Sequence, residues 1–176
     1  MRMLYTLAYP VLSEHDGHWI KAFRHEYDPQ FAVVDAHFTM AFGCTDVSQD
    51  VYMSHVKAAS DLAHRIRFTC RYAMLGADHR ADSAYVFLVP DEGYSELSRL
   101  HDHLYRGVLA EHLRLDVPFI PHITIGACSD RRLAKRLCDD LNAHGMEVGG
   151  LIDTLTVATV DDGKVRELGA FGLAAG

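Results

Sequence analysis

A pattern of four residues occurs twice in this 176-residue chain. It reads His-Phe-Thr-Met at positions 37–40 and His-Ile-Thr-Ile at positions 122–125. Alternate side chains of a β-strand point to opposite faces, so each copy places its histidine and threonine on one face and its apolar residues on the other. Imidazoles exchange protons near neutral pH, and hydroxyls donate hydrogen bonds to developing negative charge, which suits acid–base chemistry on a phosphate ester. The predicted catalytic residues are His37, Thr39, His122 and Thr124.

The surroundings of the two motifs are also alike. An apolar stretch leads into each copy, a glycine closes each run at Gly43 and Gly126, and the histidines are 85 positions apart. This pairing indicates an internal duplication. Two His-x-Thr-x strands at this separation resemble the two-histidine phosphoesterase superfamily. The amphipathic segment 19–27, followed by Asp28 and Pro29, is similar to the bacterial 2′,5′-RNA ligase-like and cyclic phosphodiesterase branch.

The resemblance extends over nearly the whole chain and implies one two-lobed domain over residues 1–176. The implied fold is α+β and bilobal, with two mainly antiparallel β-sheets facing across a central groove and helices on the outside. The implied activity is a metal-independent phosphoesterase, without cofactor, acting on 2′,3′-cyclic, related 1,2-cyclic or 2′,5′-linked phosphates of nucleotides or RNA ends.

The chemistry of that reaction explains why these residue types are paired. Opening a cyclic phosphate needs a base to deprotonate water and an acid to protonate the departing alkoxide, and two imidazoles supply both. We therefore expect His37 and His122 to carry protons. The hydroxyls of Thr39 and Thr124 would hold the phosphoryl oxygens. Which histidine is the base, and whether the reaction runs as hydrolysis or as ligation, stays open.

Periodicity, capping residues and turn residues predict four helices and about eight strands. The predicted helices cover about 14–27, 49–64, 91–113 and 130–141, with Ser13, Ser48, Pro90-Asp91 and Ser129 at their starts and Leu62 on the buried side of the second. The predicted strands are 3–8, 33–42, 67–75, 84–89, the second motif strand, 146–148, 151–160 and 165–171. A hairpin turn is expected at 161–164. The loop 76–83 carries His79 and Arg80, which could touch substrate but are expected to be solvated, as loop residues usually are.

Composition and charge restrict the partners. The net charge of −7 disfavours an extended nucleic-acid surface, so a small nucleotide or an RNA end is the expected partner. No apolar run approaches the roughly 18 residues of a membrane span and no signal peptide is recognisable, so we expect a cytoplasmic protein, and we expect it to be a monomer. The four cysteines form no CxxC pair and are expected to be reduced structural thiols.

Three other interpretations belong to different classes. A metal-dependent hydrolase could use the abundant histidines, although neither the His101-Asp102-His103 run nor the helix-face histidines have ligand spacing; chelators would abolish its activity. A non-catalytic module that binds nucleotides or RNA ends would show binding without turnover. A structural protein with two core histidines would show neither.

Overall fold

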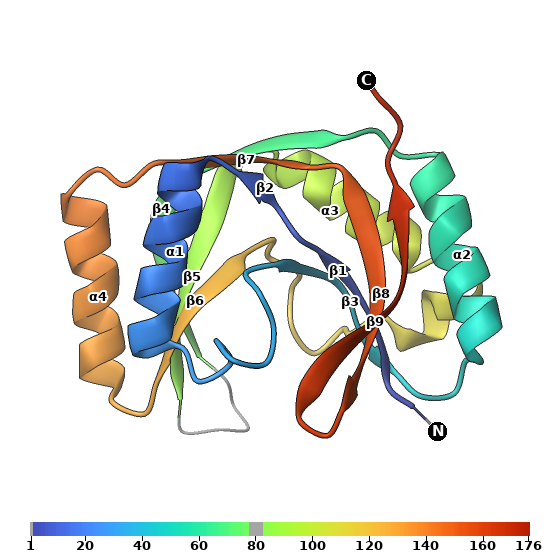
Figure 1. Ribbon diagram of the computed structural model, residues 1–176, viewed down its shortest axis with the longest axis horizontal. Coiled ribbons are helices and arrows are strands. Elements are labelled where there is room, and N and C mark those ends of the chain that lie inside the picture. Colours follow the sequence, from blue (N-terminus) through green and yellow to red (C-terminus); the bar gives the residue numbers. More distant parts are fainter. Residues whose placement is uncertain (1, 78–82) are drawn as a thin grey trace.

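The computed structural model describes residues 2–77 and 83–176 (Figure 1). The loop residues His79 and Arg80 lie outside the described residues. The described residues form nine strands, four α-helices and one 3₁₀ helix. In chain order these are β1 (Leu4–Ala8), β2 (Val11–Leu12), α1 (Glu14–Tyr27), β3 (Phe38–Cys44), α2 (Gln49–Asp61), β4 (Ile66–Ala77), β5 (Ala84–Glu92), α3 (Tyr94–Leu104), η1 (Gly107–His112), β6 (Ile123–Cys128), α4 (Arg131–Ala143), β7 (Val148–Ile152), β8 (Thr154–Asp161) and β9 (Lys164–Gly172).

The strands form one curled sheet in the order β2-β7-β4-β5-β6-β3-β1-β8-β9, and every pair of neighbouring strands is antiparallel. The two halves of this sheet meet where β3 pairs with β6, through Phe38 opposite Ile123. The predicted α+β fold with mainly antiparallel strands and outer helices is therefore confirmed. The two sheets expected on either side of the groove are the two halves of this continuous sheet.

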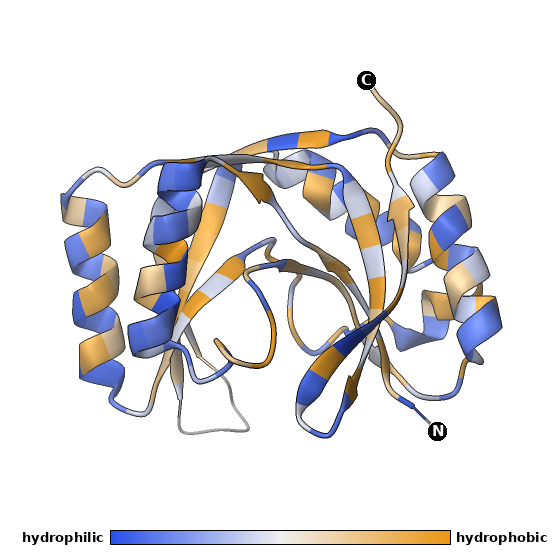
Figure 2. Cartoon of the chain, in the orientation of Figure 1, coloured by the Kyte–Doolittle hydropathy of each residue, from blue (hydrophilic) through white to orange (hydrophobic). Residues whose placement is uncertain are grey.

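The helices cover the outside of the sheet. Helices α1 and α4 contact the half that contains β6, whereas α2 contacts β1, β8 and β9 in the other half (Figure 1). Helix α3 contacts β3, β4 and β5 and so lies across the junction. Hydrophobic and hydrophilic residues alternate along the outer helices (Figure 2), as expected of helices with one face on a core. No helix in the described part of the chain is long and apolar enough to cross a membrane.

Several boundaries differ from the predicted ones. Ser13 caps α1 as predicted, by accepting a hydrogen bond from the backbone N–H of Asp16 at 3.1 Å. The predicted cap at Ser129 was wrong, because Asp130 accepts the N–H of Arg132 at 2.8 Å and α4 begins one residue later. Leu62 was predicted to be buried but follows the end of α2 and is 74% exposed.

The third helix is shorter than predicted. Strand β5 continues to Glu92, which pairs with Thr69 of β4, so 90–92 belong to the sheet rather than to the helix. Gly93 then turns the chain with a φ of 84°, a left-handed conformation that glycine adopts without steric cost. Helix α3 ends at Leu104, and a separate 3₁₀ helix follows where the sequence pattern predicted one continuous helix.

The first motif strand was predicted from 33 but begins at Phe38. The N–H groups of Val33 and Val34 both donate to the carbonyl of Gln30, at 2.9 and 3.1 Å, so this segment is a turn. Each motif histidine consequently lies immediately before its strand. The hairpin turn at 161–164 is confirmed, with positive φ at Asp162 (50°) and Gly163 (73°), as a type I′ turn requires.

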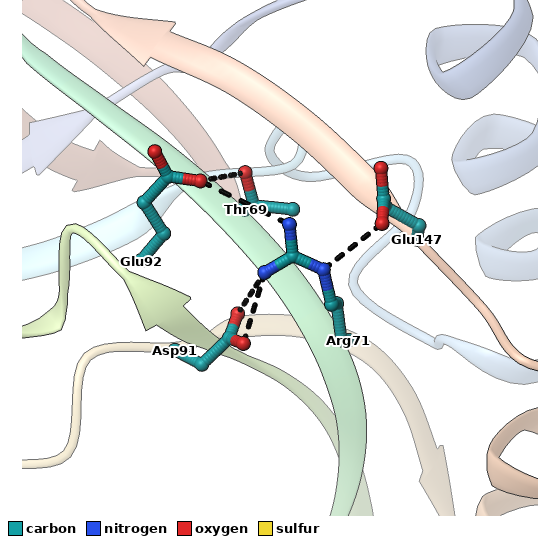
Figure 3. A network of polar contacts seen from close by, with 5 residues as sticks. All are labelled: Thr69, Arg71, Asp91, Glu92 and Glu147. Carbon is teal, nitrogen blue, oxygen red and sulfur yellow. Dashed lines mark hydrogen bonds and ion pairs between the residues drawn. The ribbon is translucent and has the colours of Figure 1, made fainter.

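A polar network on the surface links β4, β5 and the segment before β7 (Figure 3). The guanidinium of Arg71 contacts Asp91 at 2.9 Å and Glu147 at 2.9 Å, and Thr69 donates to Glu92 at 2.7 Å. Hydrogen bonds to Glu147 and then to Asp91 are the main causes that raise the pKa of Arg71. The residues are exposed, so solvent screens the network, and it serves to align neighbouring segments rather than to hold the core together.

Candidate active site

The junction between the two halves of the sheet brings the motif residues together. Phe38 and Ile123 are paired, and both are fully buried. Continuing this antiparallel register by one residue in each direction sets His37 opposite Thr124, and Thr39 opposite His122. Because side chains alternate between faces, these four lie on the face opposite to Phe38 and Ile123. Each threonine thus neighbours the histidine of the other motif.

Both histidines are held in the same way. The Nδ1 of His37 is 2.7 Å from the carbonyl oxygen of Asp35, and the Nδ1 of His122 is 2.6 Å from that of Ile120. A carbonyl oxygen only accepts hydrogen bonds, so Nδ1 carries the hydrogen in both rings. The neutral imidazole then presents Nε2 as the atom that gains or loses a proton. The repeated geometry agrees with the duplication inferred from the sequence.

Burial lowers the pKa of His37 below its usual value, and the hydrogen bond to Asp35 opposes this shift in part. Burial also lowers the pKa of His122, the hydrogen bond to Ile120 opposes that shift, and the neighbouring His37 lowers it further. The charges that act on His37 are instead those of Arg24, Asp28 and Asp35. Since neither side chain is fully covered in the structure, both remain within reach of solvent.

A cleft of about 610 Å³ lies at this junction and includes His37, Thr39 and Thr124 in its wall. His122 is not one of its lining residues and lies beside them, opposite Thr39. The remaining wall residues come from both halves of the sheet, from α1 and from the segment after it. The apolar ones include Leu7, Val33, Val34, Phe42, Ala127, Ala158, Val160 and Val165, and the polar ones are Tyr5, Arg24, Asp28, Gln30, Tyr85 and Thr159. Mostly apolar walls with a few polar groups are typical of small-molecule sites.

A buried ion pair positions the segment that carries His37. Arg24 Nε lies 2.7 Å from Asp28 Oδ2, with the two side chains only 4% and 1% exposed. The same guanidinium donates from Nη2 to the carbonyl of Val34 at 2.8 Å, and Asp28 Oδ1 accepts the N–H of Gln30 at 2.9 Å. The turn between α1 and β3 is therefore fastened to α1 at several points. Sequence reasoning took Asp28 only as a helix end and missed the i,i+4 pair that reveals this role.

An aromatic contact positions His122. Its ring stacks on Phe87 of β5, with centroids 3.9 Å apart and planes 29° apart. Phe87 in turn lies across Gly76 of β4, where an added Cβ would approach Phe87 Cε2 to 2.2 Å. His37 has a different neighbour, Tyr9, with ring centroids 6.1 Å apart and planes at 69°. Sequence reasoning missed Phe87 and Gly76, because their contact depends on strand register, which the sequence pattern leaves undetermined.

A second group of side chains could hold a metal ion. Cys44, Asp46 and His112 each offer one ligand atom, and these atoms lie within 4.8 Å of one another; the described residues contain no other such group of three. Sequence reasoning missed it because His112 is far from the other two along the chain. The group is separate from the cleft, whose wall includes none of the three.

Comparison with known proteins assigns the chain to a class and then to a family. The fold is that of the two-histidine phosphoesterases. Residues 12–164 match the family profile described as the 2′-5′ RNA ligase superfamily, and the chain belongs to that family. A search of curated protein sequences gave no match.

Solved structures share the fold over almost the full length at low sequence identity. Escherichia coli LigT in apo form is 18% identical with a TM-score of 0.58, covering 98% of each chain. The protein TT0787 of Thermus thermophilus is 14% identical with a TM-score of 0.60, again covering 98% of each chain. Kluyveromyces marxianus Usb1 is 10% identical with a TM-score of 0.52, covering 95% of this chain and 97% of its own. At these identities the likeness establishes the fold.

Proposed function

We propose that this chain is a metal-independent phosphoesterase that opens 2′,3′-cyclic phosphates, or related 1,2-cyclic or 2′,5′-linked phosphates, of nucleotides or RNA ends. The observation that carries the proposal is the crossed arrangement of the two motifs. Two imidazoles with Nδ1 bound to carbonyls and Nε2 available lie beside two threonines at one junction of the sheet. Such a set supplies a base, an acid and two hydroxyl donors around a single phosphoryl group.

The hydrolytic step follows from this arrangement. The Nε2 of one neutral histidine takes a proton from water as the water oxygen attacks phosphorus. The bond from phosphorus to the departing ribose oxygen breaks, and the other, protonated histidine gives its proton to that oxygen. The hydroxyls of Thr39 and Thr124 donate to the non-bridging oxygens as their charge grows. Ligation would use the same groups with the two histidines in exchanged roles.

A small nucleotide or an RNA end fits the cleft better than a long nucleic acid does. The cleft of about 610 Å³ is within the usual range for small-molecule sites, and the net charge of −7 disfavours many phosphate contacts. Solved complexes of E. coli LigT with 3′-AMP, NADP+ and ATP show that a protein of this fold accommodates small nucleotides. These ligands support the proposed substrate class for this chain.

The direct test is turnover of a panel of 2′,3′-cyclic nucleotides and 2′,5′-linked oligonucleotides, with and without EDTA. We expect a nucleoside monophosphate product from the cyclic substrates at a rate that EDTA leaves unchanged. His37→Ala and His122→Ala should each remove most of the activity, since a proton-transfer group typically contributes about 10²–10⁴-fold. His15→Ala is the matched control, because its side chain is 91% exposed on α1. Binding without turnover, or turnover that requires added metal, would contradict the proposal.

A further inference from the structure

The end of β3 and the end of η1 bring together three side chains that bind transition metals. Asp46 Oδ1 lies 3.9 Å from Cys44 Sγ and 3.9 Å from His112 Nδ1. A tetrahedral Zn²⁺ ion with bonds of about 2.0–2.3 Å separates its ligand atoms by roughly 3.4–3.6 Å. All three ligand atoms lie within 4.8 Å of one another, so shifts of up to about 1 Å would complete the geometry around one ion, a distance that side-chain torsions can supply.

The burial of the three side chains suits entry of an ion from solvent. Cys44 is 3% exposed and belongs to the core, and the side chain of His112 is 23% exposed. The side chain of Asp46 is 73% exposed. Two of the ligands are thus fixed by the fold, while the third lies at the surface and can close over the ion. The fourth position would face solvent and take a water molecule.

The second copy of the motif provides an internal comparison. Each copy ends in a Cys-x-Asp sequence, Cys44 with Asp46 and Cys128 with Asp130. Asp130 is the N-cap of α4 and accepts a backbone N–H at 2.8 Å. Asp46 lies before Ser48, the N-cap of α2, and faces Cys44 and His112 instead of capping that helix. The equivalent carboxylate is used for helix capping in one copy and is directed at a thiol and an imidazole in the other.

We propose that Cys44, Asp46 and His112 form a binding site for one divalent transition-metal ion, with Zn²⁺ as the ion that best suits these ligands. Thiolate, imidazole and carboxylate are the three side-chain donors that zinc uses in proteins. Binding would release the Cys44 thiol proton to solvent, since the thiolate is the ligand. The metal would join β3 to the segment that runs from η1 towards His122.

The site is structural and separate from the phosphoesterase chemistry. Cys44 is seven residues along the chain from His37, which corresponds to about 20 Å in an extended strand. A metal at this position cannot contact a phosphate held between the two motif histidines. Removal of the metal should therefore lower Tm and leave the turnover rate of the folded protein unchanged. The metal site and the proposed phosphoesterase activity can thus be tested independently.

The test is titration of the chelator-stripped full chain with Co²⁺ and then with Zn²⁺. We expect thiolate-to-cobalt charge-transfer absorption that saturates at one equivalent and disappears when Zn²⁺ displaces the cobalt. Free Zn²⁺ at 100 times its Kd should raise Tm by roughly 5–10 °C. His112→Gln and Asp46→Asn change partly exposed side chains and should weaken Co²⁺ binding at least tenfold, and Cys44→Ser should abolish the charge-transfer band.

Two controls separate this site from other thiols and imidazoles. Cys128→Ser removes the equivalent thiol of the second copy and should keep the band. The double substitution of His15 and His18 by Gln removes an exposed pair on α1 and should also keep it. The proposal would be overturned by a wild-type protein that shows no band, by a band that survives in Cys44→Ser, or by unchanged affinity in folded His112→Gln protein.

Discussion

The packing of Phe87 against Gly76 predicts that a larger residue at position 76 displaces His122. Gly76 leaves room for the ring of Phe87, on which His122 stacks at 3.9 Å. In Gly76→Ala the new Cβ would lie 2.2 Å from Phe87 Cε2, 2.7 Å from Cζ and 2.8 Å from Cδ2. Carbon atoms in good contact are about 3.5–4.0 Å apart, so the ring must withdraw by more than about 1 Å. His122 must then move with the ring or lose its stacking partner.

The size of the effect follows from that displacement. A misplacement of about 1 Å in a catalytic group can cost about 10²-fold in rate. We therefore expect Gly76→Ala to lower kcat/KM by roughly 10²-fold, equivalent to about 2.7 kcal/mol of transition-state stabilisation. The loss should appear mainly in kcat, because the substitution disturbs His122, the proposed proton-transfer group, rather than the wall of the cleft.

Steady-state kinetics on a 2′,3′-cyclic nucleotide would measure this, with Gly17→Ala as the matched control. Gly17 lies in α1, where an added Cβ meets nothing within 4 Å, so the control should keep full activity and gain up to about 1 kcal/mol of stability. If folded Gly76→Ala protein kept kcat within about threefold of wild type, the role assigned to Phe87 in positioning His122 would be refuted.

Two further predictions concern stability. Asp28→Asn leaves the Arg24 guanidinium buried without its ionic partner and should lower the free energy of unfolding in urea by about 3–5 kcal/mol. Asp61→Asn is the control, because it removes an exposed pair with Lys57 and should cost less than about 1 kcal/mol. Equal losses in the two variants would argue against a special role for the buried pair. Burial lowers the pKa of His101, so the unfolded chain binds the extra proton first as the pH falls below about 6.5, and the free energy of unfolding should decrease there. His101→Gln should lessen that decrease, and an unchanged pH dependence would contradict the assignment.

Local signals in the sequence predicted much of the fold. Each of these signals acts over a few positions and could therefore be read from the local sequence: the alternation in the two motifs, the cap at Ser13 and the hairpin residues at 161–164. The third helix was overextended because its apolar spacing continues past Leu104. Gly107, with a φ of 52°, interrupts it and is the first residue of η1. Apolar spacing alone does not distinguish one helix from two shorter segments that pack on the same core.

The supporting parts of the site depend on contacts between distant segments. The stacking of Phe87 on His122 requires the register of β5 against β6, and the cysteine–histidine group requires η1 to lie beside the end of β3. Neither arrangement produces a repeating pattern in the sequence from which it could have been predicted. The Arg24–Asp28 pair is local and has i,i+4 spacing, but such pairs are usually exposed, and its burial became evident only in the structure.

The pH dependence of kcat/KM tests the central claim most directly. With a 2′,3′-cyclic nucleotide in EDTA, wild-type protein should give a bell-shaped profile with one limb for each imidazole, centred below the usual histidine range because burial lowers the pKa of both His37 and His122. His37→Ala and His122→Ala should each lose most activity and one limb of the remainder, and the double variant should cost little more than either single one. A flat wild-type profile from about pH 5 to 9, or single variants that fold and turn over normally, would contradict the two-histidine mechanism.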